Sequence, residues 1–191
     1  EGRRIVVDTC IGNDKPRSIP NWNLRQGRFL EDLAEAGYPR DRVDTVLCTH
    51  LHVDHVGWNT MLVDGRWVPT FPSARYVFSA KDWDWLDQAP VSALGDYAGD
   101  SVRPVFAAGQ GDCVAPGFRI TDEVWLESTP GHSPGHVSIR IASRGEHAVV
   151  TGDLMHHPCQ IARPRWSSPF DFDKAAALQT RLDFLERYGD Q

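Results

Sequence analysis

Three histidines and one aspartate lie within six consecutive residues, and no other feature restricts the fold of this chain as strongly. His50, His52, Asp54 and His55 follow the short apolar run 44–49, which has the pattern of a β-strand. Alternate residues of a strand point to the same side, so we expect His50 and His52 to project together where the strand ends. Packing the four side chains without a ligand would bury polar groups that lack partners. Imidazoles and carboxylates are ligands of zinc and similar divalent ions, so the segment predicts a metal site.

Two later segments supply further candidate ligands. His132 and His136 lie in the loop 129–136, which is rich in glycine and proline and offers no interior packing role for them. Asp153 directly follows the apolar run 148–151, and loops at strand ends are where functional side chains sit on a rigid scaffold. With the first cluster, these residues can hold two metal ions, which lie about 3.5–4 Å apart in two-metal hydrolases.

The rest of the chain alternates strands with helices, which suits sheets packed together with helices outside. Hydrophobic periodicity predicts strands over 4–8, 44–49, 75–79, 118–120, 124–127, 137–142 and 148–151, a hairpin over 62–68 that turns at Asp64-Gly65, and helices over 29–38 and 81–88. Leu178, Leu182 and Leu185 predict a C-terminal helix, with Asp171 or Asp173 as its N-cap. The polar stretch 90–110 is expected to be a long binding loop or lid.

Composition excludes several classes of protein. The net charge is −6 and the pI about 5.7, which argues against a nucleic-acid partner, because such a protein needs a basic face. No run approaches the roughly 18 apolar residues of a membrane span. The four cysteines form no CxxC pair, which favours a reducing compartment and a cytoplasmic location. The chain starts at Glu1 without a methionine, so we expect a fragment that could lack a targeting segment.

The order of these motifs resembles the metallo-β-lactamase superfamily. The resemblance rests on His50-Leu51-His52-Val53-Asp54-His55, Gly131-His132, Gly152-Asp153 and, near the start, Val7-Asp8-Thr9-Cys10-Ile11-Gly12-Asn13. It implies an α/β (α+β) fold, namely a four-layer αββα sandwich formed by residues 1–191 as a single domain, truncated at both ends. It also implies the ligands: His50, His52 and His132 for a first metal, Asp54 and His55 for a second, and Asp153 as a bridge.

The chain departs from this family at one ligand of the second metal. The family supplies one more histidine after the bridging aspartate, but no histidine follows His157 here. Either the chain ends before that ligand, which is the explanation we favour, or His156 or His157 replaces it. In such a fragment the second metal would be weakly held or absent.

Within the superfamily, residues 49–57 are similar to acyl-homoserine lactonases and methyl-parathion-hydrolase-like enzymes. The resemblance implies a hydroxide that bridges two divalent ions and attacks a lactone, another ester or a phosphotriester. Zinc is the expected metal, with manganese, cobalt or iron as alternatives. Asp54 and Asp153 are the expected catalytic residues, Asp54 by passing a proton to the leaving group. Ser133 and His136 are expected to orient the ligand loop, and Trp58 and His156 are further candidates for substrate contact.

Other functions remain open on the sequence alone. A β-lactamase would need the same metals with a different pocket, and a mononuclear iron dioxygenase would need only the first site. A metal-stabilised structural domain is disfavoured, because structural zinc sites are usually closed and rich in cysteine. The expected partner is a small-molecule substrate, with no nucleic acid and no membrane, and a homodimer is one option for assembly.

Overall fold

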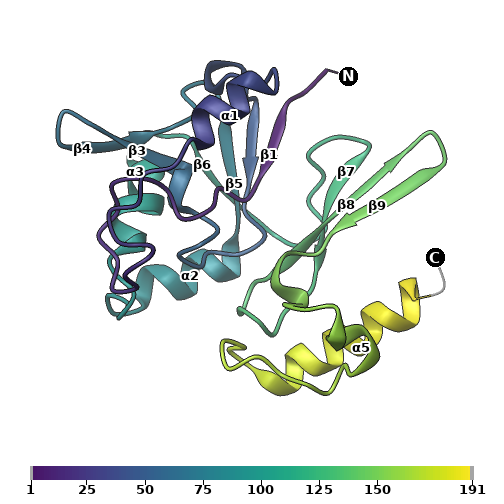
Figure 1. Ribbon diagram of the computed structural model, residues 1–191. Helices are drawn as coiled ribbons and strands as arrows, with labels where there is room; N and C mark the ends of the chain where they lie inside the picture. Colours follow the sequence, from purple (N-terminus) through teal and green to yellow (C-terminus); the bar gives the residue numbers. More distant parts are fainter. Residues whose placement is uncertain (1, 190–191) are drawn as a thin grey trace. The chain divides into compact units, whose positions relative to one another are not determined.

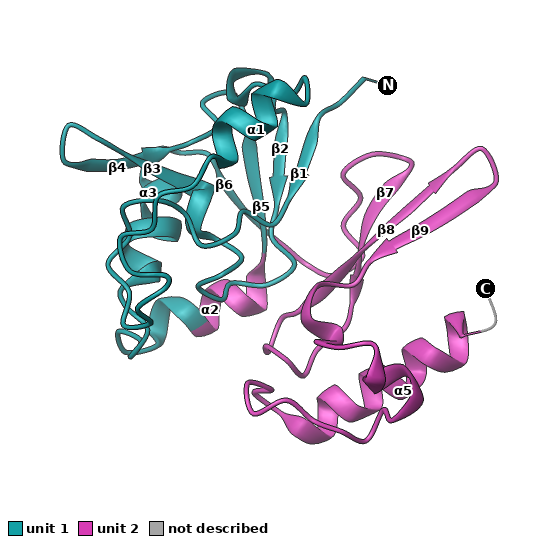
Figure 2. Ribbon diagram, in the orientation of Figure 1, with its two compact units in different colours: residues 1–78, 86–113 teal, residues 79–85, 114–191 magenta. Residues whose placement is uncertain are grey.

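A computed structural model describes residues 2–189, and the chain divides into two compact units (Figure 2). Unit 1 contains the residues up to 78 and the segment 86–113, whereas unit 2 contains 79–85 and the residues from 114 onward. None of the helices in the described part of the chain has both the length and the apolar character that crossing a bilayer requires.

Unit 1 is built on a four-stranded sheet with the strand order β1-β2-β5-β6 (Figure 1). Its strands are β1 (Ile5–Val7), β2 (Thr45–Leu47), β5 (Arg75–Ser79) and β6 (Gly111–Val114). β2 pairs in parallel with both β1 and β5, and Val46 lies opposite Val6 on one side and Tyr76 on the other. All three residues of β2 are buried, as expected for a strand inside a parallel sheet. Because β1 and β2 are parallel, the segments that follow them leave the sheet at the same edge.

Short helices and one hairpin complete unit 1. The helices are α1 (Phe29–Glu35), α2 (Ala80–Gln88, divided between the units) and α3 (Arg103–Ala107), and 3-10 turns cover Arg40–Arg42 and Gly57–Asn59. The hairpin of β3 (Thr60–Val63) and β4 (Arg66–Pro69) projects from the unit (Figure 1). Asp64 and Gly65 turn it with φ values of 49° and 74°, which confirms the predicted DG turn.

A buried ion-pair network joins distant parts of unit 1. The Lys15 side chain is fully buried, and its Nζ donates to Thr60 Oγ1 at 2.6 Å and to the Asp100 carbonyl oxygen at 2.9 Å. The same Nζ lies 3.6 Å from the centre of the Trp67 ring. Arg17 Nη1 and Nη2 donate to the two carboxylate oxygens of Asp100 at 2.6 and 2.9 Å. This network therefore anchors the loop after β1 to the hairpin and to the π-helical turn Ala98–Val102.

Unit 2 contains an antiparallel sheet of β7 (Val124–Ser128), β8 (Val137–Ser143) and β9 (Glu146–Val150). Its register pairs Leu126 with Ile139, and Ile139 with Val150. After β9 the chain forms the 3-10 turn Gly152–Leu154, the short helix α4 (Cys159–Ala162) and the long helix α5 (Lys174–Tyr188). Asp173 is the N-cap of α5, since its Oδ1 accepts from Ala175 N at 2.9 Å and from Ala176 N at 3.0 Å.

Two sequence-based expectations about the middle of the chain were wrong. The stretch 90–110 is not a long irregular loop, because the π-helical turn Ala98–Val102 and helix α3 occupy most of its second half. Residues 118–120 form no strand: Arg119 makes only an isolated bridge to Trp125. The strand β6 was not predicted, because its residues Gly111–Val114 lack the alternation and the β-branched composition that mark a strand.

Candidate metal centre

In unit 1 the predicted histidine ligands lie on the loop that follows β2. The ring centres of His50 and His52 are 4.5 Å apart, and those of His50 and His55 are 4.1 Å apart. The loop ends where Gly57 passes the segment after β1: a Cβ atom on Gly57 would lie 1.9 Å from the carbonyl carbon of Ile11. Gly57 is therefore required by this close approach of two backbones.

Asp8, directly after β1, organises this loop. Its Oδ1 accepts from Thr49 N at 2.7 Å, and its Oδ2 accepts from Thr49 Oγ1 at 2.8 Å and lies 2.9 Å from His55 Nδ1. Because a carboxylate only accepts, His55 carries its proton on Nδ1, and its unprotonated ring nitrogen is Nε2. Thr49 Oγ1, which already donates to Asp8, lies 3.1 Å from His50 Nδ1 and so accepts from it. Both histidines thus have the tautomer that binds metal through Nε2.

This role of Asp8 was missed by the sequence analysis, which quoted the residue only as part of a family-like segment. A signal existed: a carboxylate directly follows β1, and β1 ends at the same sheet edge as β2. Asp54, in contrast, is in the predicted position next to His55. Its Oδ2 lies 3.9 Å from His55 Nε2, and its side chain is 40% exposed.

In unit 2 three potential ligand atoms converge within a few ångströms. His132 lies on the loop after β7, whereas Asp153 and His156 follow β9. Asp153 Oδ2 is 3.4 Å from His132 Nε2 and 3.4 Å from His156 Nε2, and the three ligand atoms all lie within 4.8 Å of one another. Tetrahedral zinc with bonds of about 2.0–2.1 Å holds its ligand atoms roughly 3.4 Å apart. The donor set and its spacing therefore fit a divalent metal ion.

The loop that carries His132 is held on one side by α5 and the residues before it. Gly131 has φ of 131°, and a Cβ atom there would lie 2.2 Å from Ala177 N. Asp173 N donates to the Gly131 carbonyl at 2.9 Å, and Phe172 N donates to the His132 carbonyl at 3.1 Å. These backbone hydrogen bonds set the position of His132 independently of any ligand.

On its other side this loop is held by Asp82, a fully buried residue in the part of α2 that belongs to unit 2. Asp82 Oδ2 accepts from Ser133 Oγ at 2.8 Å, and Asp82 Oδ1 accepts from Gly135 N at 2.5 Å. A Cβ atom on Gly135 would lie 2.5 Å from Asp82 N, so the loop needs glycine there. Ser133 thus anchors the ligand loop, in line with the orienting role expected for it.

His136 supports the predicted bridging ligand. The residue is fully buried, and its Nδ1 lies 2.8 Å from Thr129 Oγ1. Its Nε2 accepts from the backbone N–H of Asp153 at 3.1 Å, so Nδ1 carries the proton and donates to Thr129. His136 therefore connects the end of β7 to the start of the Asp153 turn, in agreement with the orienting role expected for it.

The electrostatics of unit 2 favour a neutral His132. Burial lowers the pKa of His132 below its ordinary value and outweighs the opposing effects of Asp153 and Asp171. A neutral imidazole is the form that binds metal.

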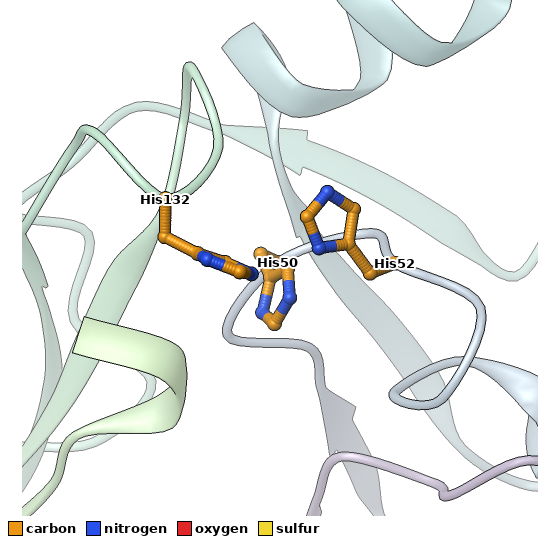
Figure 3. Close-up of side chains that lie close together, drawn as sticks. All are labelled: His50, His52 and His132. Atoms are coloured by element: carbon orange, nitrogen blue, oxygen red, sulfur yellow. The ribbon is translucent and has the colours of Figure 1, made fainter. Parts of the chain in front are cut away.

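Figure 3 shows three of the predicted ligands, with His50 and His52 on the loop after β2 and His132 on the loop after β7. Asp54 and His55 lie on the same loop as His50, whereas Asp153 and His156 lie in unit 2 with His132. His157 is exposed. Trp58 is only 8% exposed and stacks on Phe29 with ring centres 5.6 Å apart, so most of its surface serves packing inside unit 1. The metal-binding and substrate-binding roles of these residues stay predictions.

The fold is mixed α/β, and histidine and aspartate side chains of the kind that bind divalent metal ions follow its strands. The family model described as the metallo-beta-lactamase superfamily matches residues 1–188, so the chain belongs to this superfamily. A comparison with curated protein sequences found no significant match.

Several solved structures share the fold. The hydrolase AbOPH of the beta-lactamase superfamily is 27% identical with a TM-score of 0.77 over 98% of this chain. AidC, a dizinc quorum-quenching lactonase solved with its product, is 21% identical with a TM-score of 0.78 over 100% of this chain. A probable metal-dependent hydrolase from Staphylococcus aureus is 20% identical with a TM-score of 0.84 over 98% of this chain. The chain spans 65–66% of the length of these three proteins.

Proposed function

We propose that this protein is a metal-dependent hydrolase that cleaves lactones or related carboxylic esters with two divalent metal ions, zinc being the first choice. The observation that carries the proposal is that His132 Nε2 and Asp153 Oδ2, two of the proposed ligand atoms, lie 3.4 Å apart, which is the spacing of ligand atoms around tetrahedral zinc. Membership of the superfamily and the likeness to AidC, which is described as a dizinc lactonase, support the same reaction class.

The proposed ligands are those that the family pattern assigns. His50, His52 and His132 would hold the first ion, Asp54 and His55 the second, and Asp153 would bridge both. The tautomers support these assignments, because Asp8 and Thr49 place the ring protons of His55 and His50 on Nδ1, so that Nε2 is the unprotonated nitrogen of each. Zinc in such a site supplies Lewis acidity and lowers the pKa of water toward neutrality.

Side chains of the protein itself would orient the proposed ligands and transfer protons. Asp8 fixes the orientation of His55, and His136 fixes the turn that carries Asp153. Because these groups are already oriented, little reorganisation is needed during the reaction. Asp54 is partly exposed and lies beside His55, and it would take up the proton that the attacking water releases and pass it to the departing alkoxide when the ester bond breaks. The proposed substrate is a small molecule.

The test is metal analysis followed by a turnover screen on the full-length protein. Metal-free protein is reloaded with zinc, manganese, cobalt or iron and assayed on a lactone, an aryl ester, a phosphotriester and a β-lactam. The proposal expects about two metal ions per chain and the highest kcat/KM on the lactone or ester. One iron per chain with oxygen consumption would contradict it in favour of a dioxygenase, and a preference for the β-lactam would indicate a β-lactamase.

Two variants test the residue roles against a matched control. His52→Ala and Asp153→Ala should each lower kcat/KM by at least about 100-fold, because each removes a proposed metal ligand. His147→Ala is the control, since His147 is exposed on β9 and outside the proposed ligand set. Wild-type turnover by His52→Ala or Asp153→Ala, in a folded protein, would remove that residue from the mechanism.

A further inference from the structure

A second carboxylate in unit 2 lies against His132, on the ring nitrogen opposite to the proposed metal-binding one. His132 Nδ1 is 3.4 Å from Asp171 Oδ1, whereas His132 Nε2 is 3.4 Å from Asp153 Oδ2. The side chain of Asp171 is fully buried. A carboxylate at Nδ1 accepts the Nδ1 proton, which makes Nε2 the unprotonated nitrogen of the ring. Asp171 thus faces Nδ1 of His132 in the same way as Asp8 faces Nδ1 of His55.

Arg181 holds this carboxylate in turn. Arg181 Nη1 lies 3.3 Å from Asp171 Oδ2, and Arg181 Nε donates to the Pro164 carbonyl at 3.0 Å. The backbone N–H of Ser168 donates to Asp171 Oδ2 at 3.1 Å. The Arg181 side chain is fully buried, and its Nη2 has no hydrogen-bond partner within residues 2–189. Arg181 is therefore a buried cation on helix α5. Within residues 2–189, Asp171 is the one carboxylate at ion-pair distance from it.

The usual structural reasons for such a residue do not account for Asp171. Asp171 was a candidate N-cap of α5 in the sequence, but Asp173 performs that function. A buried ion pair is a poor source of stability, since the cost of removing both charges from water offsets their attraction. An apolar pair of similar volume would stabilise the fold as well and would leave His132 Nδ1 without its acceptor.

We infer that Asp171 is a positioning residue for the metal ligand His132, and that Arg181 acts on the metal site through Asp171. Asp171 selects the tautomer of His132 and the rotation of its ring, and Arg181 and Ser168 hold Asp171 in place. The inference rests on the proposed function, because it takes His132 to be a metal ligand.

The test measures zinc affinity of the full-length protein by competition with a chromophoric chelator. Asp171→Ala should weaken zinc binding by roughly 10- to 100-fold, which is the usual effect of removing the acceptor behind a metal-ligating histidine. It should also change the visible spectrum of the cobalt-loaded protein. Asp173→Ala is the matched control two residues away: it should lower Tm through loss of the helix cap and leave zinc affinity within about twofold. Equal zinc affinities for wild type and Asp171→Ala would overturn the inference.

The part played by Arg181 is tested by a double variant. If Arg181 acts through Asp171, Arg181→Met should weaken zinc binding, and Asp171→Ala combined with Arg181→Met should bind no more weakly than Asp171→Ala alone. Additive losses would show that Arg181 acts independently of Asp171 and would overturn that part of the inference.

A measurement without metal keeps the inference testable if Asp171→Ala does not fold. The ring nitrogens of His132 in the metal-free protein should show the Nδ1–H tautomer by ¹⁵N NMR, and Asp171→Asn, which preserves shape, should shift the mixture toward Nε2–H. An unchanged tautomer in Asp171→Asn would contradict the inference. If the wild-type protein binds no metal at all, the proposed function fails together with the inference. If it binds metal and Asp171→Ala binds it equally well, only the inference fails.

Discussion

Burial of Lys15 predicts a stability that rises with pH in the neutral to alkaline range. Removal from water lowers the pKa of Lys15 from 10.5 to about 7; the Asp100 carboxylate opposes this shift, and the positive charge of Arg17 adds to it. In the unfolded chain the ammonium keeps its ordinary pKa. Between the two values the unfolded state therefore binds a proton that the folded state has released. Stability increases with pH wherever the unfolded state binds more protons.

The size of this effect follows from the two pKa values. The cost of burying the ammonium is fully present below pH 7 and is relieved as the pH rises from about 7 to 10.5. One pKa unit corresponds to about 1.4 kcal/mol, so the free energy of unfolding should rise by roughly 3 kcal/mol between about pH 7 and pH 9.5. The range ends there because burial also raises the pKa of the Tyr76 phenol above its ordinary value, and this group lowers stability with increasing pH above about pH 10.

The assay is urea denaturation of the full-length protein at several pH values between about 7 and 9.5, for wild type and for Lys15→Met. Methionine has a similar length and no charge, so Lys15→Met should lack the rise and the two curves should converge toward alkaline pH. Lys174→Met, at an exposed position, is the control and should keep the wild-type slope. Parallel curves for wild type and Lys15→Met would refute the reasoning, because the pH dependence would then come from other groups.

Three further predictions concern the supports of the site. Gly57→Ala should destabilise the protein by about 3–5 kcal/mol, because the added Cβ would overlap the backbone at Ile11. The control Gly65→Ala should cost only about 1 kcal/mol, because nothing lies near its Cβ position. Similar Tm values for the two variants would contradict this prediction. Asp82→Ala should lower the free energy of unfolding, measured by urea denaturation, by about 3–5 kcal/mol, because Ser133 Oγ and Gly135 N lose a charged acceptor. A decrease below about 1 kcal/mol would show that water replaces the carboxylate. Removing metal with a chelator should lower Tm. At a free metal concentration of about 1,000 times Kd, bound metal would add about 4 kcal/mol to the free energy of unfolding, and the chelator would remove this stabilisation. An unchanged Tm would count against a bound metal.

Features that depend on neighbours in the chain could be read from the sequence. The hairpin at Asp64-Gly65 was predicted because an aspartate and a glycine tolerate the positive φ values that the turn requires. The helix α5 was predicted from leucines at helical spacing, and the strand β5 from a continuous apolar run. The three segments that hold the proposed ligands were also evident, because histidines and aspartates clustered at strand ends have few purely structural uses.

Features that depend on partners far along the chain could not be read from it. Asp8 acts on Thr49 and His55 more than 40 residues later, and Lys15 binds the carbonyl of Asp100 85 residues later, so no local pattern marks them. The sequence left Asp171 and Asp173 as equal candidates for the cap of α5, since both precede the helix. Only the tertiary structure separated them, because it brings the Asp171 carboxylate against His132 and Arg181 and leaves Asp173 beside the free N–H groups of the helix. The residue types that can bind a metal are a property of the sequence, whereas the tautomer and orientation of each ligand are decided by contacts that only the folded chain makes.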